Sequence, residues 1–259
     1  MPTRDKGNRL EFDNKTLHMT NGSVVRERAP RISEHWVQDL QSGLWTATET
    51  GAATPWAAAA TANDGGIAVA TTGGTTNNAE ELAGKHIVWK PSLSVNQNMV
   101  LETRFKSVGA TTPADGDFAI GFADAATYAS GLAYVFSAAS AFTTSAPTEF
   151  VGFYYSSVPT SGALFNSGGN NFIGLVTSKA NVDAVVATTI AKDSNFHIYR
   201  LEVNSVGNAA FFIDDNLVGT VAAAITAATA LTPYIAVIAK NSHANTGSSN
   251  YVMVGGDFA

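Results

Sequence analysis

The chain has 259 residues, of which 14% are charged, and it contains no cysteine. The lack of cysteine excludes a disulfide framework and a thiolate metal site. Residues 41–259 carry 15 acidic side chains against eight basic ones. This balance argues against nucleic acid as the main partner, because phosphate binding needs a basic face. The length fits one large β-sandwich, alone or with a small appendage.

Residues 1–33 form a polar unit of mixed charge whose apolar side chains are too scattered to build a core. We expect an extended arm that is either disordered in the free protein or docked on a neighbouring subunit. Its candidate partner-binding residues are Arg4, Arg9, Phe12, Leu17, Met19, Arg26 and Arg28. Residues 34–259 are expected to form the sandwich.

Neither a signal peptide nor a membrane span is expected. The first twelve residues carry charges and lack the apolar core of a signal peptide. Residues 221–239 are uncharged, but they are rich in alanine and include threonines and Pro233. Two strands around a turn at residues 231–233 account for this run better than a helix in lipid, because its transfer into a membrane would be poorly favoured.

Aromatic side chains provide the candidate sugar-binding residues. Trp36, Trp45 and Trp56 lie close together in the sequence among small residues. Exposed in one groove, Trp45, Trp56, Tyr154 and Tyr155 would stack on a glycan. The alternative is that the tryptophans close the edge of the sandwich or an oligomer interface.

Residues 66–74 are predicted to form a strand that ends in a glycine-rich loop, but no Gly-Lys-Ser/Thr sequence follows it, so a phosphate-binding loop is excluded. Next come Asn77, Asn78, Glu80 and Glu81, whose oxygens are of the kind that bind Ca²⁺. Their spacing matches no defined calcium loop, and the polarity of a turn explains them equally well. We therefore predict no metal site and no cofactor.

Short segments with strand character recur every 12 to 20 residues or so, separated by Pro, Gly or Asn, which is the rhythm of a sandwich or jelly roll. They comprise residues 99–106, 118–122, 132–136, 150–155, 171–176 and 250–254. In the first of these, Leu101, Thr103 and Phe105 alternate with charged residues, as in a half-buried strand. Glycines inside three of the segments predict room for a neighbouring aromatic side chain, or a bulge.

The clearest pattern is a double hairpin at residues 196–221. Two runs of apolar alternation flank a turn at residues 205–208, and a second turn at residues 214–216 reverses the chain again. Three consecutive antiparallel strands are predicted. The first is expected to be central in its sheet, since apolar residues occupy both of its faces near its start.

This pattern, His-x-Tyr-Arg-x-Glu at 197–202 and Phe-Phe-Ile-Asp-Asp-Asn at 211–216, resembles the late strands of concanavalin A-like lectin/glucanase and laminin G-like jelly rolls. Asp215 stands where that superfamily usually has glycine, and it tolerates the left-handed turn conformation better than most residues. The resemblance implies an all-β, two-sheet antiparallel jelly-roll sandwich.

Taken with the other strand segments over residues 36–255, the chain is similar to a jelly-roll family common in virion proteins of tailed bacteriophages. Such domains occur as head decoration (cement) proteins, as head fibres and within tail proteins. The resemblance implies a virion location after synthesis in the host cytoplasm. The implied partners are the major capsid protein or other virion proteins, with further copies of the chain in a homo-oligomer such as a trimer.

Enzymatic activity is not expected. The glucanase branch uses carboxylates at Glu-x-Asp-x-x-Glu spacing on one strand, and this triplet is missing from the sequence. Glu102 and Glu202 are each two residues from an arginine and are expected to form ion pairs. Asp115 and Asp117 are expected in a turn, and the five histidines are dispersed.

Three functions remain as hypotheses. The first is a capsid decoration protein whose arm binds the shell while the sandwich faces outward. The second is a glycan- or receptor-binding domain of a phage tail or fibre. The third is a bacterial surface adhesion or carbohydrate-binding module, which would normally need an export signal.

Overall fold

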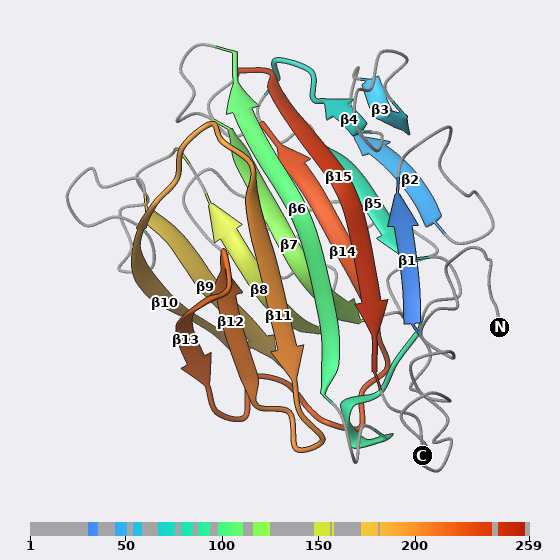
Figure 1. Ribbon diagram of the computed structural model, residues 1–259, viewed down its shortest axis with the longest axis vertical. Coiled ribbons are helices and arrows are strands. Elements are labelled where there is room, and N and C mark those ends of the chain that lie inside the picture. The colour runs from blue at the N-terminus through green and yellow to red at the C-terminus, as the bar shows by residue number, and fades with distance from the viewer. Residues whose placement is uncertain are drawn as a thin grey trace, which may run out of the picture.

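The computed structural model describes residues 31–35, 45–50, 54–58, 67–75, 79–84, 88–93, 98–110, 116–124, 148–155, 157, 172–180, 182–239 and 243–256. In these ranges, fifteen strands form two antiparallel sheets that pack face to face, and Pro91–Leu93 forms a short 3-10 turn (Figure 1). The same ranges contain no helix long and apolar enough to cross a membrane. The prediction of an all-β, two-sheet antiparallel sandwich is confirmed.

The first sheet has eight strands. Its order is β13 (Asn216–Val221), β12 (Ala209–Ile213), β11 (His197–Val203), β6 (Met99–Gly109), β15 (Asn245–Gly255), β4 (Ala68–Thr71) and β3 (Thr54–Ala58), and β1 (Arg31–His35) also pairs with β15. Strand β6 occupies one edge of β15 along its whole length, so β4 and β1 share the other edge. Strand β11 is central, as predicted.

The second sheet has seven strands. Its order is β10 (Val182–Ala191), β9 (Phe172–Lys179), β8 (Glu149–Tyr155), β7 (Asp117–Asp124), β14 (Leu231–Ile238), β5 (Ala79–Gly84) and β2 (Trp45–Thr50). The predicted strands thus appear in both sheets, except for residues 132–136, which lie outside the described residues.

The turn predicted at residues 231–233 is wrong, because these residues begin β14. Leu231 and Trp89 exchange two backbone hydrogen bonds of 2.8 and 2.9 Å. The hydroxyl of Thr232 donates to the Gly84 carbonyl at 2.9 Å. Pairing between β14 and β5 starts only at Tyr234, so the missing N–H of Pro233 breaks no hydrogen bond to β5.

Aromatic rings from the two sheets interlock in the core. The ring centroids of Phe105 on β6 and Phe118 on β7 are 5.3 Å apart, and those of Phe153 on β8 and Tyr199 on β11 are 5.2 Å apart. All four side chains are buried. Such pairs add about 0.5–1.5 kcal/mol each beyond the area that they bury, so they hold the sheets at a fixed spacing.

Two glycines inside strands allow a close backbone approach, whereas the sequence predicted room for an aromatic ring of the neighbouring strand or a bulge; the ring that lies near Gly152 belongs to Phe150 of the same strand. Gly121 of β7 lies directly opposite Gly152 of β8. A Cβ atom on Gly121 would approach the Val151 carbonyl oxygen to 2.1 Å, and one on Gly152 would lie 2.8 Å from the Phe150 ring. The missing side chains therefore permit a close backbone approach and make room for an aromatic ring.

The double hairpin is also confirmed. At its second turn, Asp214 and Asp215 both adopt positive φ angles, of 50° and 64°. Positive φ at both central residues is the geometry that matches the twist of a two-residue hairpin, and Asp tolerates it. The aspartate in place of the family's glycine therefore leaves the hairpin intact.

Candidate functional site

Polar groups gather on the outer face of the eight-stranded sheet. On β6, Leu101, Thr103 and Phe105 are buried, while Arg104 is exposed and Glu102 is partly exposed. This is the alternation predicted from the sequence. Strand β11 continues the same face with Arg200 and Glu202, so charged side chains of two neighbouring strands form one outward surface.

Arg200 is the centre of this surface. Its Nε lies 3.2 Å from Glu202 Oε1 and its Nη1 lies 3.0 Å from Asp215 Oδ1. The guanidinium carbon also lies 4.2 Å from the centre of the Phe212 ring. The ion pair predicted for Glu202 is confirmed. With three partners around one cation, the surface is internally neutralised rather than open to a charged ligand.

The ion pair predicted between Glu102 and Arg104 is not the arrangement found. The hydroxyl of Tyr251 donates to Glu102 Oε1 at 2.9 Å, and Arg104 donates to the side chain of Asn250. Burial and the neighbouring Glu102 carboxylate raise the pKa of Tyr251, so the phenol remains a donor. Side chains on the outer face of β15 therefore hydrogen-bond to side chains of β6, in addition to the backbone pairing of the two strands.

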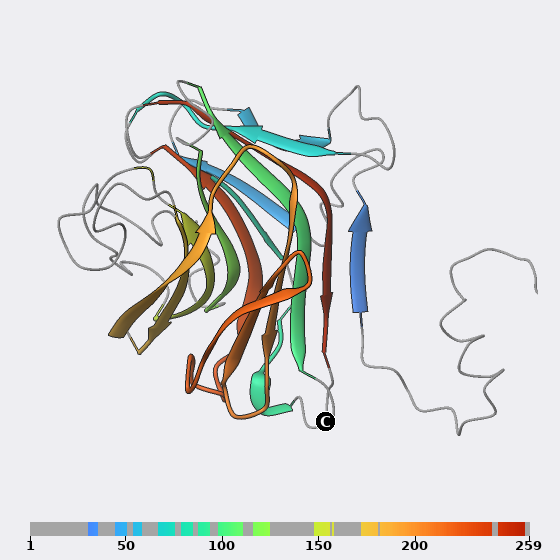
Figure 2. The same cartoon turned by 60° about the vertical axis from the view of Figure 1, so that its left-hand side comes forward.

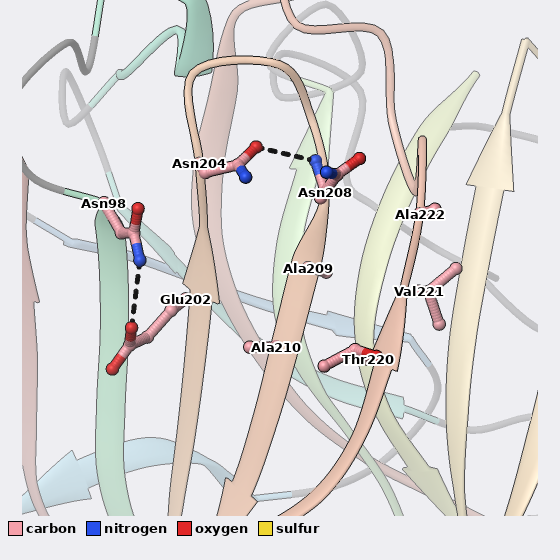
Figure 3. A pocket seen from close by; sticks show the side chains of 9 residues that line it. All are labelled: Asn98, Glu202, Asn204, Asn208, Ala209, Ala210, Thr220, Val221 and Ala222. Atoms are coloured by element: carbon pink, nitrogen blue, oxygen red, sulfur yellow. Dashed lines mark hydrogen bonds between the residues drawn. The ribbon is translucent and has the colours of Figure 1, made fainter.

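A shallow groove of about 270 Å³ lies at one end of β11, β12 and β13 (Figure 3). Its polar lining consists of Asn98, Glu202, Asn204, Asn208 and Thr220, and small side chains such as that of Ala210 complete it. The groove thus combines amides, a hydroxyl and one carboxylate over an alanine-rich surface.

Hydrogen bonds fix the groove lining. Asn98 donates to Glu202 Oε2 at 3.0 Å, and the side-chain oxygen of Asn204 accepts the backbone N–H of Asn208 at 3.0 Å (Figure 3). The side-chain oxygen of Asn208 accepts the Ala223 N–H at 2.8 Å. The two turn asparagines are held through their oxygens, which leaves their NH₂ groups as donors for a ligand.

The chemistry of the groove is hydrogen bonding. Glycoside hydrolysis needs two carboxyl groups on either side of the bond that is cut. Glu202 is the only carboxylate in the lining, and Asn98 and Arg200 already hold it. The lining suits a neutral ligand with several hydroxyl or amide groups.

A second cluster joins the two ends of the hairpin. His197 contacts Asp214 through Nδ1 at 2.6 Å and Asp193 through Nε2 at 3.0 Å. Burial alone would lower the pKa of His197, but hydrogen bonds to both aspartates outweigh it and raise the pKa. Desolvation likewise opposes the shift at Asp193, whose pKa is nevertheless lowered by hydrogen bonds from Asn195 and His197. His197 therefore bridges the loop before β11 and the turn after β12, and the two aspartates favour its protonated form.

The predicted glycan-stacking role of the aromatic residues is wrong. Trp45, Trp56, Tyr154 and Tyr155 are 3%, 3%, 4% and 1% exposed. Trp56 donates through Nε1 to the Glu80 carbonyl at 3.1 Å, and the Tyr155 ring stacks on Phe118 at 6.2 Å. A ring with no exposed face cannot stack on a sugar. Trp36 lies outside the described residues.

The carboxylates of the polar segment at residues 77–81, which were considered as calcium ligands, do not converge. Glu80 and Glu81 are consecutive residues of β5, so their side chains point to opposite faces of the sheet and cannot converge on one ion. Glu81 accepts the Tyr234 hydroxyl at 3.1 Å, and burial raises the pKa of that tyrosine. Asn77 and Asn78 lie outside the described residues. Within the described ranges, no group of three or more His, Asp or Glu side chains is placed to hold a metal.

Asp117 was expected in a turn, but it is the first residue of β7 and is fully buried. Its carboxylate accepts the Ser157 backbone N–H and, at 3.3 Å, the side-chain amide of Asn245. Its role is therefore to tie β7 to β15 at one end of the sandwich. Asp115 lies outside the described residues.

The candidate arm residues Arg4, Arg9, Phe12, Leu17, Met19, Arg26 and Arg28 also lie outside the described residues. The described chain starts at β1, which spans the predicted boundary between arm and sandwich at residues 33 and 34. Strand β1 pairs antiparallel with residues 251–255 of β15, and Ser33 lies opposite Met253. The first described segment is thus attached by backbone pairing at a sheet edge.

No protein-family model and no curated protein sequence matches the chain. Solved structures do match it. The carbohydrate recognition domain of Emp47p aligns with a TM-score of 0.53 at 10% identity, over 91% of this chain and 100% of that domain. A glycoside hydrolase family 16 endo-glucanase from Bacteroides ovatus aligns with a TM-score of 0.57 at 9% identity, over 86% and 99%. The chain has a concanavalin A-like lectin/glucanase fold.

A protein of unknown function from Shewanella oneidensis MR-1 also aligns, with a TM-score of 0.55 and 12% identity over 98% of this chain and 97% of that one. At such identities the likeness concerns the fold alone. The fold is shared by a sugar-binding domain and by a hydrolase, and it assigns neither activity to this chain.

The groove residues Asn98, Asn204, Asn208 and Thr220 were not among the residues singled out in the sequence. The asparagines at either end of the 205–208 turn are a local signal, since side chains of this type cap turns. Asn98 carries no such signal. It meets Glu202 because β6 and β11 pair in a register that places Val100 opposite Glu202.

Proposed function

We propose that the chain is a non-enzymatic structural protein of a tailed-bacteriophage virion. In this proposal it is a capsid decoration protein that docks on the major capsid protein through its N-terminal arm and displays the β-sandwich at the capsid surface. The supporting observation is the attachment of β1, which begins in the last residues of the predicted arm and joins β15 by edge pairing. Edge pairing gains affinity mainly from the backbone, so a segment of varied sequence can use it for adhesion.

Two further observations favour adhesion over catalysis. The aromatic residues expected to bind sugar belong to the core, and the groove holds a single carboxylate that already has partners. The charged surface of β6 and β11 is largely paired within itself, which suits a face that remains in solvent.

Co-sedimentation with undecorated capsids of the phage that encodes the chain tests this proposal. We expect saturable binding of the full chain at a fixed copy number. A variant lacking residues 1–30 retains β1 and should lose capsid binding while keeping its β-sheet circular dichroism. The full-length variant with alanine at Phe12, Leu17 and Met19 serves as a check that needs no truncation. Unimpaired binding by both variants would rule out docking through the arm.

The groove supports a second candidate function, recognition of a neutral saccharide by a tail or fibre domain. Its amide and hydroxyl donors suit sugar hydroxyls, and a carbohydrate recognition domain shares the fold. On a glycan array, we expect any hit to be lost in Asn98→Ala and Thr220→Ala, which alter exposed side chains, and to persist in Leu217→Ala outside the groove. An array without hits, or hits that both groove variants retain, would count against this function.

A further inference from the structure

Strand β1 is attached to the molecule in a way that a second copy can reproduce. Among the described strands it pairs with β15 alone, through five residues from Arg31↔Gly255 to His35↔Tyr251. Figure 2 shows β1 beside β15 at the margin of the sandwich. The neighbouring part of the same edge of β15 pairs with β4, through residues 246–249. Residues 251–255 therefore form a separate acceptor position for one short strand.

The chain connectivity makes this strand separable. Strand β1 belongs to the eight-stranded sheet, whereas β2, the next strand in the sequence, belongs to the seven-stranded sheet. Residues 36–44 connect β1 to β2. A fully extended connection of nine residues spans at most about 30 Å, which limits how far a released β1 can reach from β2. No hairpin joins β1 to β2, and among the described strands the release of β1 breaks no pairing other than that with β15.

We propose that residues 251–255 of β15 accept β1 from a second copy of this chain, so that neighbouring copies are joined by exchanged strands. The exchanged pairing restores the contacts of the closed form, since donor and acceptor sequences are unchanged. The balance between the two forms then depends on concentration and on the entropy of the connection rather than on new contacts. The proposal builds on the adhesive role of the N-terminal region and names its partner as the chain itself.

A second copy fits this position better than an unrelated strand. The acceptor offers Val252 and Val254 on its buried side and Tyr251 and Met253 on its outer side. The register already aligns β1 with each of these positions, including Ile32 with Val254. A second copy carries the same β1 sequence, so its β1 can pair with residues 251–255 in the same register, with Ser33 opposite Met253.

The absence of cysteine from the chain permits a direct test. Ser33 and Met253 lie opposite each other, and opposed Cβ atoms in antiparallel strands are about 4.5–5.5 Å apart, close to disulfide geometry. Purified Ser33→Cys and Met253→Cys single variants are mixed at high protein concentration, incubated to permit exchange and then oxidised. The double variant, oxidised under dilute conditions, shows whether the pair itself can be bridged.

The matched control uses Glu202→Cys and Ala210→Cys, which are also opposed across two strands but lie within the β11–β12 hairpin. A hairpin strand cannot exchange alone, so this mixture measures random cross-linking. We expect the Ser33 and Met253 mixture to give a mixed disulfide dimer at least five times more abundant than the control. A yield equal to the control, or a double variant that forms no bridge, would overturn the proposal. Neither outcome depends on capsid binding, because no capsid is present.

Discussion

The Trp56→Ala substitution tests whether the Trp56 side chain stabilises the fold or binds sugar. The side chain is 3% exposed, its ring lies 6.4 Å from that of Phe105, and its Nε1 donates to the Glu80 carbonyl. A buried tryptophan removes about 150–250 Å² from water, which corresponds to about 4–6 kcal/mol at about 25 cal/mol per Å². Truncations of buried aromatic residues to alanine cost about 3–5 kcal/mol. We expect Trp56→Ala to lower the free energy of unfolding by about 4 kcal/mol.

Urea unfolding followed by far-ultraviolet circular dichroism measures this change. Leu217→Ala is the control, since Leu217 is 58% exposed and its truncation should change stability by about 0.5 kcal/mol or less. A sugar-stacking tryptophan would instead be dispensable for stability. If Trp56→Ala lowers the free energy of unfolding by less than about 1 kcal/mol, the burial argument is refuted and Trp56 is again a candidate sugar-binding residue.

Three further substitutions test the fold and the His197 bridge. Gly121→Ala should lower the free energy of unfolding by about 3 kcal/mol or more, since the new Cβ would meet the Val151 backbone. An unchanged urea midpoint would contradict this. Gly207→Ala should lower the free energy of unfolding by more than about 1 kcal/mol, because Gly207 has a φ of 84° and a Cβ would lie 2.3 Å from the Ile225 carbonyl oxygen. An unchanged thermal unfolding temperature would argue against this turn geometry. The pKa of His197 is raised in the fold above its ordinary value of 6.5, so its stabilisation is fully present below about pH 6.5 and is lost as pH rises through the folded pKa. His197→Gln should therefore destabilise the protein more at pH 5.5 than at pH 9, and equal losses at the two pH values would contradict the bridge.

The sequence determined the class of fold and the hairpin that lies within it. Alternation at Leu101, Thr103 and Phe105 identified a half-buried strand, and the pattern at residues 196–221 identified three strands with their two turns. Both signals are local. Side chains alternate along any strand, and a turn of two to four residues is specified by the residues within it.

Only the tertiary structure decided which aromatic rings are exposed and which residues form a groove. Trp56 is buried because its ring packs against Phe105, which is far away in the sequence, whereas the sequence left open whether the tryptophans are exposed in a groove or close the edge of the sandwich. Asn98 and Glu202 meet through the register of β6 with β11. Residues 231–233 extend into β14 because Trp89 and Gly84 supply hydrogen-bond partners from other segments. Each outcome depends on pairing between distant strands, which a local pattern of side chains does not encode.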